Sequence, residues 1–262
     1  MICDAVIRGN FRIAQDTFRM VLECPEIARQ AQAGQFVTLP VSYPLDTWRR
    51  VFTVYEVNGD QLVIVYRVVG ENTKLYSRMR ACQKISLAGP FGQPAIIDFT
   101  VKRFILVAGG CGLAPLRYIA HAIGETTKAR VVIAAGFPTR RHVFNIAGFA
   151  RCGDCQMAIA TDDGSEGFRG TASNLLWEIL NAPDGQLPAS EETHIFTCGP
   201  RPMMKAVSEL AAEMGIGCTV LLEAKMACGG MGACLGCTAK TTKGLKQICQ
   251  DGPCFDAKDV IW

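Results

Sequence analysis

Strands and helices alternate between residues 101 and 222, and no other feature of the sequence restricts the fold as strongly. The apolar runs at 102–110 and 129–137 predict buried strands, and the apolar spacing at 111–126 between them predicts a helix. Further elements follow in the same order: strands at 155–164 and 193–200, and helices at 171–181 and 201–215. Because βαβ units build parallel sheets, we expect a doubly wound domain here.

The first hundred residues have a different pattern, that of short strands. Turn sequences such as NGD separate segments that are rich in β-branched and aromatic residues, many of them alternating with polar ones. These segments are 11–25, 34–41, 49–57, 61–69 and 84–92. Five or six strands at this spacing predict a small antiparallel barrel or sandwich.

Composition argues against several classes of protein. A chain of 262 residues with 49% hydrophobic residues can bury the cores of two domains. The net charge of +3, without a run of basic residues, argues against nucleic-acid binding. The N-terminus lacks the apolar core of a signal peptide, and the apolar stretches are too short to span a membrane. We therefore expect an intracellular, cytoplasmic protein.

The chain has thirteen cysteines, and their distribution is uneven. Cys3, Cys24, Cys82 and Cys218 stand singly in apolar or mixed surroundings, and we expect them to pack as reduced thiols. The segment 228–237, CGGMGACLGC, instead crowds three cysteines and four glycines into ten residues. Such a segment cannot build a packed core, and glycine lets its backbone curl closely around something else.

The spacing of the tail cysteines predicts a metal centre. Cys234 and Cys237 form a CxxC pair, Cys228 precedes them by five intervening residues, and Cys249 follows after eleven. Four thiolates at spacings of this kind hold a 2Fe–2S cluster, and glycine N–H groups can donate to its sulfides. Structural zinc is the alternative, but zinc sites usually pair two CxxC motifs. We favour the cluster, with Cys228, Cys234, Cys237 and Cys249 as its ligands.

A glycine-rich turn, FILVAGGCGLAPL, joins the first predicted strand of the second domain to its helix. Backbone N–H groups and a helix N-terminus at such a turn can bind phosphate, although the spacing here is not GxGxxG. A tight turn without any ligand would need the same glycines. Two further strand ends, TDDG and TCGP, belong to the same expected sheet edge and favour a dinucleotide site. Its candidate residues are Gly109, Gly110, Gly112, Asp162, Asp163, Cys198 and Gly199.

Together these motifs resemble a known family along nearly the whole chain. RRVFT at 49–53, preceded by GQF, is similar to the flavin motif R-x-[YF]-[ST] of the ferredoxin-reductase superfamily, and VVGENT at 68–73 is similar to its second flavin segment. GGCGLAPL and TCGP resemble its nicotinamide motifs. With the cysteine-rich tail added, the chain resembles the electron-transfer subunits of class 1B dihydroorotate dehydrogenases.

The resemblance implies three parts: an FAD-binding antiparallel β-barrel at 1–98, an NAD-binding α/β domain at 99–222, and a 2Fe–2S segment at 223–262. It also implies that Arg50 pairs with the flavin pyrophosphate, which suits a guanidinium fork, and that Phe52 and Thr53 lie along the isoalloxazine. The further FAD contacts that it implies are Val51, Val65, Tyr66, Arg67, Asn72 and Thr73.

The resemblance bears on the choice between NADH and NADPH. Superfamily members that prefer NADPH commonly carry Ser-Arg where this chain has Asp162 and Asp163. Carboxylates repel a 2′-phosphate and accept hydrogen bonds from ribose hydroxyls, so we expect NADH. The pair Arg140–Arg141 would argue the other way if it lay near the adenosine, and the aspartates would also suit a simple turn.

Three departures from the family pattern affect these expectations. Five residues rather than four separate Cys228 from Cys234, so the loop must bulge at Gly229 for Cys228 to reach iron. Cys254 is near enough in sequence to replace Cys228 as a ligand. The flavin motif reads RVFT where this family often has RPxS, which would also suit a paralogue that serves another partner.

The implied function is an electron relay in pyrimidine (UMP) biosynthesis. NADH and FAD exchange a hydride, the 2Fe–2S cluster passes electrons singly, and no catalytic acid or base is assigned to this chain. The implied partner is an FMN-containing dihydroorotate dehydrogenase subunit, in a heterotetramer with two copies of each chain. Two alternatives stay open: the FAD/NAD(P) subunit of a ferredoxin:NADP reductase, sulfide dehydrogenase or hydrogenase complex, and a zinc-stapled nucleotide-binding regulator.

Overall fold

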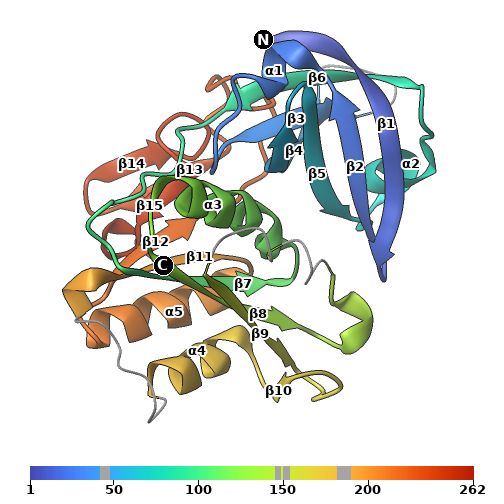
Figure 1. Cartoon of the computed structure of the whole chain (residues 1–262). Helices are drawn as coiled ribbons and strands as arrows, with labels where there is room; N and C mark the ends of the chain where they lie inside the picture. Colours follow the sequence, from blue (N-terminus) through green and yellow to red (C-terminus); the bar gives the residue numbers. More distant parts are fainter. Residues whose placement is uncertain (42–47, 145–148, 150–153, 182–189) are drawn as a thin grey trace. The chain divides into compact units, whose positions relative to one another are not determined.

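The computed structural model of the chain describes every residue except 42–47, 145–148, 150–153 and 182–189 (Figure 1). The chain forms two compact units, and each unit is built from two separate stretches. The first unit contains Met1–Ala95 and Leu222–Cys254, and the second contains Ile96–Leu221 and Phe255–Trp262. Most of the cysteine-rich tail therefore belongs to the same unit as the N-terminal strands.

Six antiparallel strands close into a barrel in the first unit (Figure 1). The strands are β1 (Ile2–Ala14), β2 (Thr17–Glu23), β3 (Phe36–Pro40), β4 (Arg49–Asn58), β5 (Gln61–Arg67) and β6 (Lys84–Phe91). They pair in the order β1-β2-β5-β4-β3-β6, and β6 pairs with β1 to close the barrel. Leu22, Ile64 and Leu87 have no exposed surface and form part of the barrel core. The predicted antiparallel barrel is confirmed.

The predicted strand segment 11–25 is a hairpin rather than one strand. β1 ends at Ala14, β2 begins at Thr17, and Asp16 between them adopts a φ of 52°. Aspartate tolerates this left-handed conformation better than most residues do. Ala14 pairs with Thr17 across the turn, so the turn interrupts the apolar pattern of the sequence only briefly.

Two short helices complete the N-terminal part of the first unit: α1 (Pro25–Ala28) and α2 (Glu71–Arg78). α2 begins inside the VVGENT motif. The helix has the sequence ENTKLYSR, which contains too few apolar residues to show a helical period. The sequence pattern therefore predicts a flavin segment at this place but not the helix.

A seven-stranded sheet forms the second unit. Its strands are β7 (Arg103–Gly109), β8 (Arg130–Phe137), β9 (Cys155–Thr161), β10 (Phe168–Arg169), β11 (Thr193–Cys198), β12 (Gly217–Leu221) and β15 (Cys254–Asp256), in the order β10-β9-β8-β7-β11-β12-β15. The strands from β10 to β12 in this order pair in parallel. The predicted parallel sheet is confirmed, and β10, β12 and β15 extend it beyond the four predicted strands.

Helices cover both faces of this sheet, as a doubly wound fold requires. α3 (Leu113–Thr126) lies on one side, while α4 (Ala172–Leu180) and α5 (Arg201–Glu213) contact each other on the other side (Figure 1). All three match helices that the sequence predicts. Among the residues that the structure describes, no helix is long and apolar enough to cross a membrane.

Cys3 and Cys24 form a disulfide, so the expectation of two separate core thiols is wrong for this pair. The two residues are 21 positions apart in the sequence. Pairing of Val6 with Glu23 brings the start of β1 beside the end of β2. The proximity thus arises from strand pairing, which the residues around each cysteine do not reveal.

Candidate metal centre and nucleotide sites

Four thiols of the tail come together on the first unit. The Cys228 and Cys234 thiols are hydrogen-bonded to each other, and Cys249 interacts with both Cys237 and Cys228. Cys237 and Cys249 are each only 2% exposed, whereas Cys228 is half-buried and Cys234 is exposed. The structure therefore brings Cys228 together with Cys234, and Cys249 with Cys237 and Cys228, in pairwise contacts.

Backbone N–H groups point at the sulfurs of this cluster of thiols. Burial raises the pKa of the Cys228 thiol, but hydrogen bonds from the backbone of Cys234, Ala233 and Gly230 and from the Cys234 thiol outweigh it, so the pKa falls to about 6. The backbone N–H of Gly236 donates to Cys234 Sγ at 3.4 Å. Donors of this kind stabilise thiolates, which are the form that binds iron.

Glycines let the thiol-bearing loop lie directly on the barrel. Gly229 and Gly230 adopt φ values of 65° and 94°, which favour glycine. A Cβ built on Gly229 would lie 3.0 Å from Arg49 Cβ, and one on Gly230 would lie 3.0 Å from the Phe36 ring. Side chains at these two positions would therefore lift the loop away from β3 and β4.

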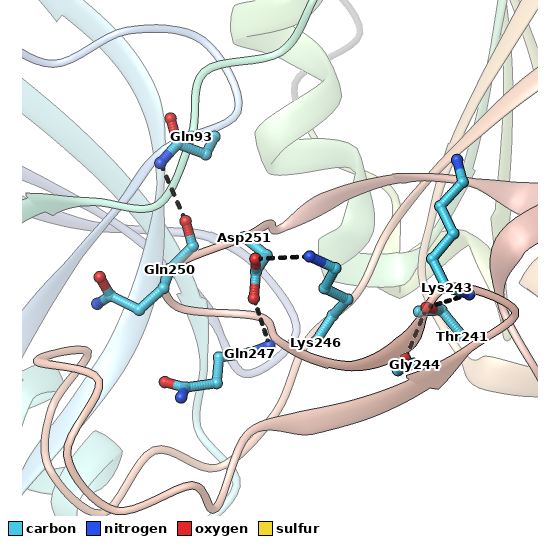
Figure 2. Close-up of polar contacts among 8 residues, drawn as sticks. All are labelled: Gln93, Thr241, Lys243, Gly244, Lys246, Gln247, Gln250 and Asp251. Carbon is cyan, nitrogen blue, oxygen red and sulfur yellow. Dashed lines mark hydrogen bonds and ion pairs between the residues drawn. The ribbon is translucent and has the colours of Figure 1, made fainter.

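Polar contacts fix the segment that carries Cys249 (Figure 2). The Asp251 carboxylate accepts hydrogen bonds from Lys246 Nζ at 3.2 Å and from the Gln247 backbone at 2.7 Å. Gln93 Nε2 donates to the Gln250 carbonyl at 3.0 Å, as Figure 2 shows, and Gln250 Nε2 donates to the Gly230 carbonyl at 3.1 Å. These bonds connect the hairpin of β13 (Thr238–Thr241) and β14 (Gly244–Gln247) to the loop that carries Cys228.

Cys254, the alternative ligand, occupies a different environment. A Cβ built on Gly34 would lie 3.2 Å from the Cys254 sulfur, so this thiol packs against the barrel chain at Gly34. Burial raises the pKa of the Cys254 thiol to about 12. Because the pKa of the Cys249 thiol is raised as well, to about 11, position rather than ionisation separates Cys254 from the four candidate ligands.

A pocket of about 460 Å³ opens beside β4 in the first unit. Arg50, Val51 and Thr53 line it, as the resemblance to the flavin motif implies. Sequence reasoning missed its other walls, which come from β3 and from the start of the tail. These walls include Phe36, Leu222, Met226 and Pro253, and Val69 of the VVGENT segment also lines the pocket. Only the neighbouring GQF motif hinted at Phe36, and no motif marked Leu222 or Met226.

Several implied flavin residues lie in the barrel core instead. Phe52 is 9% exposed, and its ring packs edge-on against Tyr66 and Tyr76 at centroid distances of 5.9 and 5.8 Å. Val65 and Tyr66 are buried as well, while Arg67 is exposed. The side chains of Phe52, Val65 and Tyr66 thus support the strand that presents Arg50 and Thr53.

Thr73 caps helix α2. Its hydroxyl oxygen accepts hydrogen bonds from the backbone N–H groups of Val69 at 2.9 Å and Gly70 at 3.2 Å, and the hydroxyl donates to the Gly70 carbonyl. Asn72 lies in the first turn of the helix and is half-exposed. The free N–H groups of this turn are the kind of donor that binds a phosphate.

In the second unit, glycines pack the ends of β7 and β11 against each other. A Cβ built on Gly112 would lie 2.1 Å from the Cys198 carbonyl oxygen, and one on Gly199 would lie 2.9 Å from Gly109 Cα. Gly110 adopts a φ of 53° and has no atom within 4 Å of its Cβ position. Three of the predicted glycines therefore have a packing role, and Gly110 leaves open space beside the turn.

The two aspartates at the end of β9 differ in their contacts. Asp163 accepts hydrogen bonds from the Ser165 backbone at 2.9 Å and from the Ser165 hydroxyl at 2.5 Å, which lower the pKa of its carboxyl. The Arg140 backbone N–H donates to the same hydroxyl at 2.8 Å. Asp163 thus closes a turn, as the simpler interpretation expected, and the Arg140–Arg141 pair lies beside it. Asp162 is exposed at the same edge.

The barrel, the parallel sheet and the thiol loop define an oxidoreductase of the ferredoxin-reductase fold with an iron–sulfur tail. A solved NADH-dependent reduced ferredoxin-NADP oxidoreductase matches 98% of this chain and 90% of its own, with a TM-score of 0.86 and 26% identity. Residues 106–209 match the family model of the oxidoreductase NAD-binding domain. Residues 223–261 match that of the iron-sulfur cluster binding domain of dihydroorotate dehydrogenase B.

The chain belongs to the family of dihydroorotate dehydrogenase B (NAD(+)) electron transfer subunits. It is 32% identical to the member from Caldanaerobacter subterraneus subsp. tengcongensis over 98% of both chains. It is 33% identical to the member from Streptococcus thermophilus, over 100% of this chain and 99% of the other. A ferredoxin NADP+ reductase from Neisseria gonorrhoeae, at 18% identity and a TM-score of 0.66, shares the fold.

Proposed function

We propose that this chain carries electrons between NAD(H) and a catalytic dihydroorotate dehydrogenase subunit through FAD and a 2Fe–2S cluster. One observation carries the proposal: the four-thiol loop and the pocket beside β4 share residues within one compact unit. Phe36 lines the pocket and contacts Gly230 of the loop, and Met226 lines it and accepts a hydrogen bond from Gly229. A flavin in this pocket and a cluster on these thiols would be neighbours.

The residues present fit both groups. Arg50 offers a guanidinium for a pyrophosphate, Thr53 a hydroxyl for the flavin ring, and the first turn of α2 free N–H groups for phosphate. Cys228, Cys234, Cys237 and Cys249 offer four sulfurs, and backbone N–H groups donate to those of Cys228 and Cys234. When bound, FAD exchanges a hydride with nicotinamide and single electrons with the cluster. The chain itself would bind, orient and shield these groups.

We assign the nicotinamide to the edge formed by the ends of β7, β9 and β11. Open space at Gly110 would admit a pyrophosphate beside the N-terminus of α3. Asp162 and Asp163 place negative charge where an NADPH phosphate would lie, which favours NADH. Arg140 and Arg141 are close to the same turn and carry the opposite charge, which would favour NADPH. A test of the preference for NADH must therefore include variants of these two arginines.

We place dihydroorotate oxidation in a partner subunit that carries FMN, in a cytoplasmic heterotetramer with two copies of each chain. The family's name, electron transfer subunit, supports this division. The relay would serve pyrimidine biosynthesis.

Anaerobic purification tests the relay directly. We expect two irons, two acid-labile sulfides and one FAD per chain, with EPR of the reduced protein that is typical of a 2Fe–2S cluster. Cys234→Ser should lose the iron and sulfide, whereas Cys82→Ser, which changes an exposed cysteine outside the tail, should retain them. A fully folded wild-type protein without iron and sulfide would contradict the proposal.

A second candidate follows from the 26% identity to the NADH-dependent reduced ferredoxin-NADP oxidoreductase. The two functions differ in the electron donor. We expect a complex purified through a tag on this chain to reduce NAD with dihydroorotate and not with reduced ferredoxin. Reduction by ferredoxin alone would support the second candidate instead.

A further inference from the structure

We infer that Arg49 is a positioning residue for the iron–sulfur centre. The methylene groups of its side chain, called the stem below, form the surface on which Gly229 packs, and Cys228 directly precedes Gly229. The inference rests on the proposed cluster. It also concerns the departure in spacing, since five residues separate Cys228 from Cys234 and Gly229 is where the longer loop must bulge. The flavin motif R-x-[YF]-[ST] begins at Arg50, so the motif gives Arg49 no role.

The guanidinium of Arg49 is fixed by the barrel. Its Nε donates to Thr38 Oγ1 at 3.0 Å and its Nη2 to the Thr38 carbonyl at 2.9 Å, both on β3. Nη2 also donates to the Ser86 carbonyl at 2.8 Å, and Nη1 to Ser86 Oγ at 3.3 Å, both on β6. With the side chain 9% exposed and held across β4, β3 and β6, the methylene stem has one position.

The stem of Arg49 forms the surface on which the loop rests. A Cβ built on Gly229 would lie 3.0 Å from Arg49 Cβ, 3.0 Å from Cδ and 3.2 Å from Cγ. Contacts this short mean that a Cβ at position 229 fits only if the Arg49 stem moves by a few tenths of an ångström. Gly229 also adopts a φ of 65°, so the backbone turns sharply immediately after Cys228. At Gly229 the loop thus packs directly on the Arg49 stem, as it packs on the Phe36 ring at Gly230.

This arrangement joins the two candidate cofactor sites through a single residue. Arg49 lines the pocket beside β4, and Arg50, the proposed pyrophosphate contact, follows it in the same strand. Cys228 precedes Gly229 on the other side of the contact. The position of the Arg49 methylene groups on β4 therefore determines the position of the Cys228 sulfur relative to the pocket.

Paired substitutions test the contact between Gly229 and the Arg49 stem, with the EPR spectrum and the rate of iron release as readouts. Gly229→Ala should shift the EPR g values and release iron to a chelator about tenfold faster, because the new Cβ meets the stem and a left-handed φ strains alanine. Adding Arg49→Ala to Gly229→Ala removes Cγ and Cδ but keeps the Cβ contact and the left-handed φ, so it should move the g values only part of the way back to the wild type. Arg49→Lys keeps Cβ, Cγ and Cδ, so it should keep the wild-type spectrum while melting at a lower temperature.

Arg29→Ala, which changes an exposed arginine of the same unit, is the matched control and should alter neither readout. An unchanged spectrum in Gly229→Ala, or one that Arg49→Ala does not move back toward the wild type, would overturn the inference while the cluster itself stands. A changed spectrum in Arg49→Lys would assign the effect to the guanidinium rather than to the stem, and would also overturn the inference. If the variant with Arg49→Ala does not fold, the spectra of Arg49→Lys and Gly229→Ala are sufficient to decide. A wild-type chain without iron would overturn the proposed function together with this inference.

Discussion

At the scale of single residues, the cysteines show how neighbours decide the chemistry of identical side chains. Backbone hydrogen bonds to Cys228 outweigh its burial and lower the pKa of its thiol to about 6. Burial raises the pKa of the Cys218 and Cys254 thiols to about 12. Burial also raises the pKa of the Cys249 thiol, to about 11, so ionisation alone does not separate candidate ligands from packing cysteines.

Thr73 is a residue whose effect should be local and measurable. Thr73→Val removes the oxygen that accepts hydrogen bonds from the backbone of Val69 and Gly70. We expect a loss of about 1 kcal/mol in the free energy of unfolding, together with a lower FAD content after gel filtration. Ser77→Ala, which changes a hydroxyl later in the same helix, should leave the FAD content unchanged. Equal FAD loss in both variants would argue against a specific role for the cap.

At the scale of elements, the ends of β7 and β11 approach so closely that glycine is required for two different reasons. Gly112 has an ordinary helical φ of −60°, but a Cβ there would lie 2.1 Å from the Cys198 carbonyl oxygen. Gly110 has the opposite situation, with open space and a φ of 53°. One position is limited by packing between strands, and the other by backbone conformation alone.

The two alanine variants should separate these causes. Gly112→Ala must push β11 away from the turn and should lower the free energy of unfolding by about 3 kcal/mol or more. Gly110→Ala has only the left-handed conformation to overcome, at about 1 kcal/mol. Urea denaturation followed by circular dichroism measures both. The interpretation fails if Gly110→Ala is the more damaging of the two.

The contact between β11 and β12 should make the second unit sensitive to acid. His194 on β11 faces Thr219 on β12, with Nε2 and Oγ1 2.9 Å apart, and burial lowers the pKa of its imidazole although Asp256 and Asp98 partly oppose this. The unfolded chain, with a histidine pKa of about 6.5, takes up a proton that the folded chain resists. The stabilising contribution is therefore complete above about pH 6.5 and declines as the pH falls below that value.

Thermal melting between pH 7 and pH 5 tests this sign. We expect the melting temperature of the wild type to fall with pH more steeply than that of His194→Asn, which cannot take up the proton. A steeper slope in His194→Asn than in the wild type would show that the sign is wrong.

At the scale of the whole molecule, the chain returns to the barrel after completing most of the sheet. Leu222–Cys254 joins the N-terminal strands in the first unit, and Phe255–Trp262 joins the second. This path brings the candidate cluster ligands beside the candidate flavin pocket, although about 170 residues separate RRVFT from CGGMGACLGC. A small cysteine-rich tail that could not fold alone is thus supported by the barrel core.

Two tail variants should distinguish ligand from packing cysteine in the intact chain. Cys249→Ser should remove iron and sulfide and abolish electron transfer to the partner, yet retain FAD and NADH-dependent reduction of a two-electron dye. Cys254→Ser should keep its full iron content, because this thiol packs at Gly34 rather than among the other four. Iron analysis and flavin absorbance provide the measurements. Iron loss in Cys254→Ser alone would reverse the ligand assignment.

Sequence by itself determined the features that depend on local pattern: the alternation of strands and helices from 101 to 222, the short strands before it, and the spacing of the tail thiols. Only the tertiary structure decided which residues meet across the chain. It joined Cys3 to Cys24, placed Phe36 and Met226 on one pocket, and seated Gly229 on Arg49. Periodicity and spacing report on neighbours along the chain, whereas these contacts arise from closure of the barrel and from the return of the tail to it.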